Sequence, residues 1–275
     1  MEEKISSNTE LSAKLKTNEQ KKSLGFKPNL MSLSSFINRA MDEPVNLDKL
    51  YTEISIGTSA NFQEEIYAII PYEKENAYTF IIYRDTAKLV ELGTDVIAAN
   101  FLYHYWKMGL VEYRQTVEEF LGSSFHSIPL SCENFSLMPF SISTSPKRDI
   151  WINPGRIKEL KIVTDQKTIV SLFNDFVFYL DRKGKAIYDQ MYRSFLVHGI
   201  VKRYVGYMPV GWGMGLLEYL NVSSSCPIRK AINGLDFLDI PGYGKDFFGK
   251  IVEYHDNCVS GKTQQHIFTS LNISE

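Results

Sequence analysis

Residues 157–180 read IKELKIVTDQKTIVSLFNDFVFYL, and no other segment restricts the possible folds of this chain more strongly. Apolar and polar residues alternate along it over strand-length intervals. Thr164-Asp165-Gln166 and Asn174-Asp175 are residues typical of tight turns. Turns this short join antiparallel neighbours, because parallel strands require a long crossover connection. The segment therefore predicts two or three short antiparallel strands.

A second hairpin is predicted near the start of the chain. Residues 64–73, EEIYAIIPYE, and residues 77–85, AYTFIIYRD, are rich in β-branched and aromatic side chains and are separated by a short polar turn. Two further strands are expected over residues 128–142 and 149–152, on either side of a turn at Pro146. Antiparallel hairpins therefore account for most of the predicted strands.

Helices are predicted at three places. Residues 111–122, VEYRQTVEEFLG, repeat apolar side chains near the helical period and end at Gly122, a typical helix terminator. Residues 185–205 have helical spacing as well, and residues 33–49 are typical of a short helix and turn. Residues 85–110 are ambiguous. The fold class that follows is α+β, with mostly antiparallel sheet hairpins and a few packed helices.

The length of 275 residues allows one large domain or two small ones, and the 44% of apolar residues is enough for a packed core. Residues 1–30 are polar and charged, which predicts a flexible, disordered tail. We expect residues 31–63 to form an N-terminal extension, residues 64–205 the main domain, and residues 206–275 a C-terminal extension packed on that domain.

Cysteine usage and hydropathy indicate the compartment. The three cysteines, Cys132, Cys226 and Cys258, are odd in number and far apart, which suits a reducing environment better than a disulfide framework. No run reaches the roughly 18 apolar residues of a membrane-spanning helix, and the first residues lack the apolar core of a secretory signal. We therefore expect a cytoplasmic protein without membrane association.

Motifs of common enzymes are missing from the sequence. It contains no GxSxG, HExxH, P-loop or GxGxxG pattern, and its five histidines are never at metal-ligand spacing. The glycines of GWGMG, residues 211–215, lack the strand and helix that a nucleotide loop needs. Cys132 near His126 is best interpreted as a small buried thiol. We predict no catalytic residue, no metal, no cofactor and no enzymatic activity.

Charge is distributed unevenly along a chain whose net charge is only −2. Residues 31–140 carry 7 Lys or Arg against 15 Asp or Glu, whereas residues 141–205 carry 12 against 6. A basic segment of this kind can face nucleic acid, or it can be a solvated sheet edge whose lysines oppose aggregation. The candidate DNA contacts are Lys147 and Arg148 at the predicted hairpin tip, with Arg156, Lys158, Lys161, Arg193, Lys202 and Arg203.

An ordered set of short motifs resembles the ComK family, the competence transcription factors of Gram-positive bacteria. The motifs are EEFLGSSF at 118–125, SLMPFSISTSPKRDIWIN at 136–153 and AIYDQMYRS at 186–194, preceded by a strand pair at 66–86. Gly122, Ser123 and Ser124 match the family's G-S-S turn. Trp151 matches its W-I-N strand, for which we expect a role as a core anchor. Gln190 and Arg193 match its late Q-x-x-R motif.

The resemblance implies a sequence-preferring transcriptional activator of DNA-uptake genes, which binds paired A·T-rich boxes in double-stranded DNA as a dimer. Residues 64–205 would be its DNA-binding domain. Residues 125–129 depart from the family, because they replace a longer loop rich in Lys and Arg. The alternative is a diverged ComK-like protein–protein module that regulates a partner protein without binding DNA itself.

Overall fold

The computed structural model describes residues 31–35, 43–72, 78–122, 124, 127–142, 145–205, 215–241, 249–250, 252–253 and 256. The predicted tail at residues 1–30, Ser123 of the G-S-S motif and the side chain of Lys147 lie outside the described residues.

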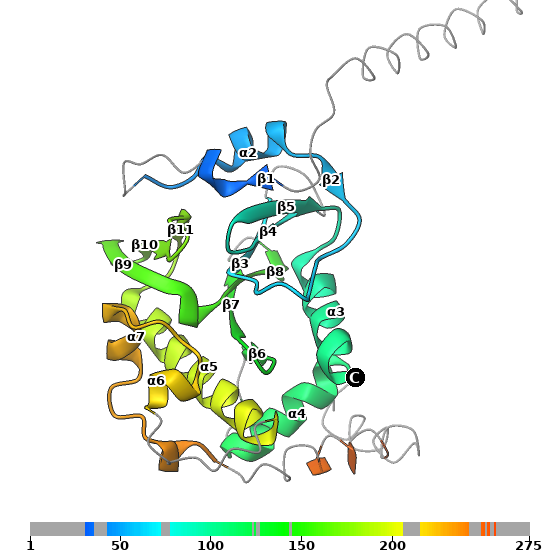
Figure 1. Cartoon of the computed structure of the whole chain (residues 1–275), viewed down its shortest axis with the longest axis vertical. Helices are drawn as coiled ribbons and strands as arrows, with labels where there is room; N and C mark the ends of the chain where they lie inside the picture. Colours follow the sequence, from blue (N-terminus) through cyan, green and yellow to red (C-terminus); the bar gives the residue numbers. More distant parts are fainter. Residues whose placement is uncertain are drawn as a thin grey trace, which may run out of the picture.

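The larger of two sheets has the strand order β1-β5-β4-β3-β8-β7-β6, with β2 beside β5 (Figure 1). Its pairs are antiparallel except for β2 with β5. The predicted α+β class and the predicted hairpin of residues 64–85 are confirmed, the latter as β3 and β4. The strands are β1 (Met31–Ser32), β2 (Ile56–Gly57), β3 (Ala68–Pro71), β4 (Thr79–Ile82), β5 (Thr86–Val90), β6 (Leu130–Ser131), β7 (Ser136–Ile142) and β8 (Ser145–Ile152).

The hairpin of β7 and β8 contains a bulge. Ser141 pairs with Asp149, but the next residue of β7, Ile142, pairs with Ser145. Residues 146–148 therefore have no partners in register and form a bulge, where a proline within a strand is tolerated. Pro146 lies in this bulge rather than in the turn that the sequence predicts, so Lys147 and Arg148 belong to β8 instead of the hairpin tip.

A smaller sheet follows directly in the chain, with the order β11-β10-β9. β9 (Ile157–Thr164), β10 (Lys167–Leu172) and β11 (Val177–Leu180) are antiparallel, which confirms the prediction for residues 157–180. The second turn uses a left-handed residue, Asp175, with φ of 61°. The Val45 amide donates to the Val177 carbonyl at 2.8 Å, which ties the early chain to β11.

The helices confirm the two long predicted segments. Gly122 ends α4 in the left-handed conformation, with φ of 62°, and its amide donates to the carbonyls of Glu118 and Glu119. The ambiguous residues before it include a separate helix, α3. The helices are α2 (Leu47–Glu53), α3 (Thr94–Trp106), α4 (Leu110–Leu121), α5 (Gly184–Val205), α6 (Leu216–Tyr219) and α7 (Cys226–Ala231), with short 3-10 turns η1 (Leu33–Ser35), η2 (Pro154–Arg156) and η3 (Phe237–Asp239).

One hydrophobic core joins these elements. α3 contacts β8 and α5 contacts β7, and the two helices lie to either side of these strands in Figure 1. Buried side chains from Leu33 to Ile240 belong to a single cluster. Residues 215–241 are part of it, because α7 packs on both α5 and β9. No helix among the described residues combines the length and the apolarity that crossing a bilayer requires.

Candidate nucleic-acid interface

Among the side chains that the structure describes, the predicted DNA-contacting cations lie in several separate parts of the fold. Arg156 is only 16% exposed, its Nε lies 2.7 Å from Glu65 Oε1, and its Nη1 donates to Ser223 Oγ at 3.0 Å. A guanidinium with two such partners already has its charge compensated. Arg156 therefore joins parts of the fold rather than facing solvent.

Two cations near the end of α5 also have structural surroundings. Arg203 donates to the backbone carbonyls of Phe237 and Ile240, which fastens η3 to α5. Burial lowers the pKa of its neighbour Lys202. Arg203 holds the C-terminal segment against the helix and Lys202 is partly buried, so both are poor candidates for contacts with phosphate.

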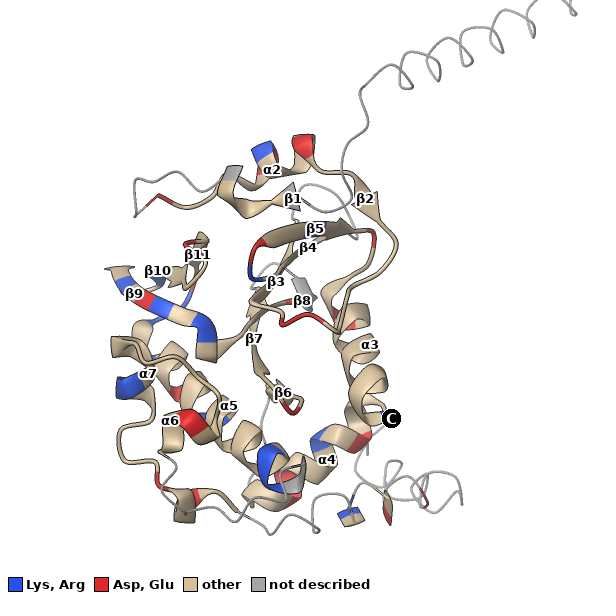
Figure 2. Cartoon of the chain, in the orientation of Figure 1, with Lys and Arg blue, Asp and Glu red and all other residues tan. Residues whose placement is uncertain are grey.

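β9 carries two of the predicted contacts, with an acidic residue between them (Figure 2). Lys158 pairs with Asp175 at 2.6 Å, in an ion pair whose side chains are 43% and 57% exposed. Lys161 is exposed further along the strand. Exposed ion pairs of this kind contribute little to stability, so Lys158 could exchange Asp175 for another anion.

A polar groove of about 610 Å³ lies between the first half of α5 and β7. Ala186, Gln190 and Arg193 line it from α5, because residues three or four apart share one face of a helix. Ser141 of β7 and Arg182, just before α5, line the other part. The groove therefore combines two arginines with one carboxylate, Asp189, and neutral hydrogen-bonding groups.

Hydrogen bonds fix the walls of this groove. Arg182 donates from Nη2 to the Ser141 carbonyl and from Nη1 to the Asp181 carbonyl at 2.8 Å. Gln190 donates from Nε2 to the Ser127 carbonyl at 3.2 Å, which connects α5 to the chain that follows α4. These bonds hold both sides of the groove in place without occupying all the donors of Arg182.

The bulged end of β8 is next to the groove. Asp149 is opposite Ser141 in the strand register, and burial raises the pKa of its carboxyl, against the opposing effects of the Ser141 hydrogen bond and the Arg182 charge. Arg148 directly precedes Asp149 and is half-buried. Arg148 is part of this end of the β7–β8 hairpin, and Arg182 contacts the same end through the Ser141 carbonyl.

Several residues that carry the sequence resemblance meet in this groove. Ser124 of the G-S-S motif, Pro139 of the M-P-F strand, and Gln190 and Arg193 of the late motif all line it. Arg182 also lines the groove but is not among the contacts that the sequence analysis predicts. It lies just before α5 and reaches the groove through the packing of that helix against β7, so no local sequence signal identifies it.

Trp151 has a different position. It is 5% exposed and is opposite Pro139 in β7 and Ile69 in β3, in the middle of the larger sheet. Its large ring is part of the hydrophobic core, so it makes no surface available to a ligand.

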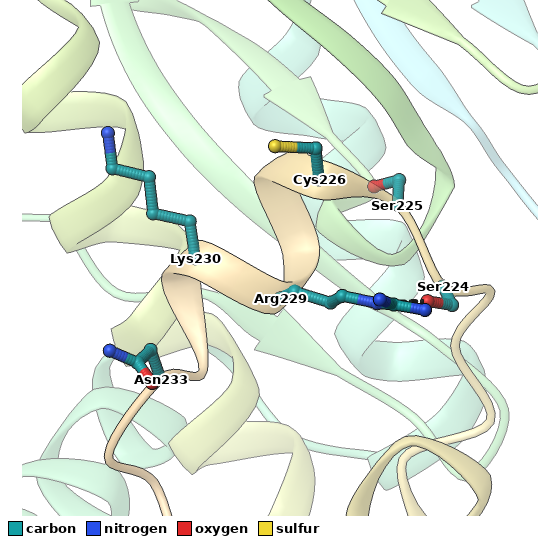
Figure 3. A pocket seen from close by; sticks show the side chains of 6 residues that line it. All are labelled: Ser224, Ser225, Cys226, Arg229, Lys230 and Asn233. Carbon is teal, nitrogen blue, oxygen red and sulfur yellow. Dashed lines mark hydrogen bonds between the residues drawn. The ribbon is translucent and has the colours of Figure 1, made fainter.

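A second hollow, of about 530 Å³, lies along the exposed side of α7 (Figure 3). Arg229 extends toward Ser224 and donates to its Oγ at 2.7 Å, whereas Lys230 points the opposite way and lies 4.5 Å from the centre of the Tyr188 ring. Cys226 is exposed on the same helix. Because the two cations diverge, this hollow does not concentrate positive charge on one point.

One buried pair has the residue types of a catalytic dyad. Ser131 Oγ lies 2.8 Å from His198 Nδ1, and His198 Nε2 lies 3.0 Å from the Leu220 carbonyl oxygen. Since the carbonyl can only accept, Nε2 carries the proton and Nδ1 accepts from the serine. Both residues are at most 1% exposed, so this pair joins β6, α5 and the end of α6 inside the core.

No protein-family model matches this chain, and no curated protein or solved structure matches it either. Within the described part of the chain, no three His, Cys, Asp or Glu side chains form a possible metal site. The groove between α5 and β7 is therefore the basis for assigning a function.

Proposed function

We propose that this protein is a sequence-preferring transcriptional regulator of the competence, or DNA-uptake, type, which binds A·T-rich double-stranded DNA. The groove between α5 and β7 and the adjoining bulged end of β8 would form its DNA surface. The observation that carries the proposal is that Arg182 lies in one groove with four residues of the ComK-like motifs, Ser124, Pro139, Gln190 and Arg193.

The chemistry of the groove suits a phosphate backbone. Arginines that neutralise phosphates release counterions and supply most of the affinity of non-specific DNA binding. Ser124 and Ser127 line the same groove and have hydroxyls that can donate to phosphate oxygens. Asp189 also lines it and opposes this attraction, so the net charge of the groove is modest.

The neighbouring hairpin has a suitable shape for reading DNA. Two antiparallel strands can enter a DNA groove as a ribbon, and narrow A·T-rich minor grooves attract arginine. Lys147 and Arg148 lie in the bulge of β8, which changes the direction of the strand at this end. The proposal therefore assigns the phosphate contacts to the α5 groove of the protein and the contacts within the DNA minor groove to the hairpin.

Fluorescence anisotropy with an A·T-rich duplex and a G·C-rich duplex, between about 50 and 200 mM salt, tests this proposal. The groove variant Arg182→Ala/Arg193→Ala should weaken binding about tenfold or more. It should also lower the salt slope, the steepness with which the logarithm of the binding constant falls with the logarithm of the salt concentration, by about 2. The matched control is Lys49→Ala/Arg114→Ala, which removes two exposed cations from α2 and α4. Equal losses in both variants, or no binding at low salt, would contradict the proposal.

The alternative of a protein-binding module has one observation in its favour. Val163 and Tyr179 are 48% and 45% exposed. They share a face of the smaller sheet, because Lys161, Ile169 and Tyr179 are aligned across its three strands. This small apolar area would be the first place to seek a protein partner if the duplexes do not bind.

A further inference from the structure

A separate pocket of about 450 Å³ contains charged groups of both signs. It shares no lining residue with the α5 groove. Its walls come from the start of β3, the turn between β4 and β5, the end of η2 and the turn between β10 and β11. The side chains used below are Glu65, Tyr67, Arg84, Asp85, Arg156 and Phe173.

The inner part of the pocket is held by a fixed network. Glu65 Oε1 accepts from Arg156 Nε at 2.7 Å and from Asn153 Nδ2 at 3.0 Å. The Arg156 guanidinium lies 5.8 Å from the centre of the Tyr67 ring and is also bonded to Ser223. Because each group is positioned by another, this part of the pocket is formed before any ligand arrives.

The rim offers charges that are not yet satisfied. Arg84 and Asp85 are exposed, and Arg84 has no hydrogen bond or ion pair within the described residues. Glu65 uses only one of its two carboxylate oxygens in hydrogen bonds to other described residues. A ligand could therefore find one cation and two carboxylates with capacity to bind.

Tyr67 lies among all four charged groups. Burial raises the pKa of its hydroxyl, and the charges of Arg156, Glu65, Arg84 and Asp85 all act on it, the arginines lowering and the carboxylates raising its pKa. The hydroxyl therefore stays protonated at neutral pH and can donate a hydrogen bond. No hydrogen bond of this hydroxyl to another described residue is present.

The balance of charge selects the class of ligand. Two arginines and two carboxylates cancel, so a simple anion or cation would be attracted by one pair and repelled by the other. A zwitterion satisfies both signs at once. The half-buried ring of Phe173 adds an apolar wall, and the volume is in the range of small-molecule sites.

We propose that this pocket binds a free amino acid with an apolar side chain. Its carboxylate would face Arg84 and the Tyr67 hydroxyl, its ammonium would face Asp85 and Glu65, and its side chain would lie against Phe173. This binding site is additional to the proposed DNA surface and would give the protein a small-molecule effector.

Titration calorimetry on the full chain without DNA tests the proposal, so its outcome does not depend on DNA binding. L-Phenylalanine, L-leucine and L-methionine serve as zwitterionic probes. At least one should bind with a dissociation constant of about 1 mM or tighter. Two analogues of that amino acid serve as controls, one without the ammonium group and one without the carboxylate. Each should have a dissociation constant at least about tenfold higher than that of the amino acid itself.

Variants locate the binding in this pocket. Arg84→Gln and Asp85→Asn should each weaken the binding of the amino acid about tenfold, because each removes a charge at the rim without changing the core. Arg114→Gln on α4 is the control and should leave binding unchanged. Thermal unfolding shows that each variant is folded. The proposal is overturned if no probe binds, if the carboxylate-only analogue binds equally well, or if the rim variants bind like the control.

Discussion

Arg156 Nε lies 2.7 Å from Glu65 Oε1, so a cation from the basic segment of the chain is paired with a carboxylate from the acidic one. The two segments are separated in sequence, but here they are joined within one fold. A charge map of the sequence therefore overstates the positive surface, because part of the basic segment is neutralised inside the protein.

Glu65→Gln should lower the free energy of unfolding by about 1 to 3 kcal/mol, because it leaves the Arg156 charge without its partner in a largely buried site. Both side chains of this pair are less than a third exposed, at 16% and 27%. Urea denaturation measures the change. Asp175→Asn, which breaks the exposed pair with Lys158, should cost less than about 1 kcal/mol. Similar losses for both variants would show that burial does not govern these pairs.

Gly199 of α5 is required where η3 packs on the helix. A Cβ at this position would lie 2.7 Å from Ile240 Cδ1 and 3.0 Å from Ile240 Cγ2. Gly199→Ala should therefore destabilise the protein by about 1 to 3 kcal/mol, although alanine ordinarily favours a helix over glycine. Ile240→Val shortens the opposing side chain and should recover part of the loss in the double variant. Additive effects of the two substitutions in denaturation would contradict this contact.

His198 makes stability depend on pH. Burial lowers its pKa from 6.5 to about 3, so the unfolded chain takes up a proton below pH 6.5 while the folded chain does not. Stability is therefore complete above pH 6.5 and is lost as the pH falls toward 3, by up to about 1.4 kcal/mol per pH unit.

The His198→Gln variant tests this origin of the pH dependence. Glutamine can keep the hydrogen bond to the Leu220 carbonyl but cannot be protonated. Chemical denaturation across the same pH window should give a shallower slope for the variant than for the unchanged protein. Parallel slopes would assign the acid sensitivity to other groups.

Periodicity predicted most of the regular structure. The alternation in residues 157–180 and the helical spacing in residues 185–205 depend on local sequence, so β9 to β11 and α5 were found with nearly the right bounds. The bulge at residues 146–148 could not be predicted, because strand register depends on the partner strand. The prediction that Pro146 lies in the hairpin turn was therefore wrong.

The partners of the candidate cations could not be predicted from the sequence, and the reason is physical. Sequence shows that Arg156 and Arg203 are cations, but not that Glu65 and the carbonyls of η3 are their partners. Arg182, in contrast, was not among the predicted contacts. Its place in the groove depends on how α5 packs against β7, which no local pattern encodes.

Arg193 and Arg203 lie on the same helix and should have opposite effects when substituted. Arg193 is exposed in the groove, so Arg193→Ala should lower the salt slope of DNA binding by about 1 and change the free energy of unfolding by less than about 0.5 kcal/mol. Arg203 holds two backbone carbonyls, so Arg203→Ala should cost about 1 to 3 kcal/mol of stability and leave the salt slope unchanged.

Arg193→Lys separates charge from geometry at the same position. Lysine keeps one positive charge, so the salt slope should return to its original value even if affinity is only partly restored. Anisotropy titrations at several salt concentrations and urea denaturation of each variant measure the two effects independently. If Arg203→Ala reduced the salt slope as much as Arg193→Ala, the DNA surface would extend over the whole of α5, and the groove would not be its centre.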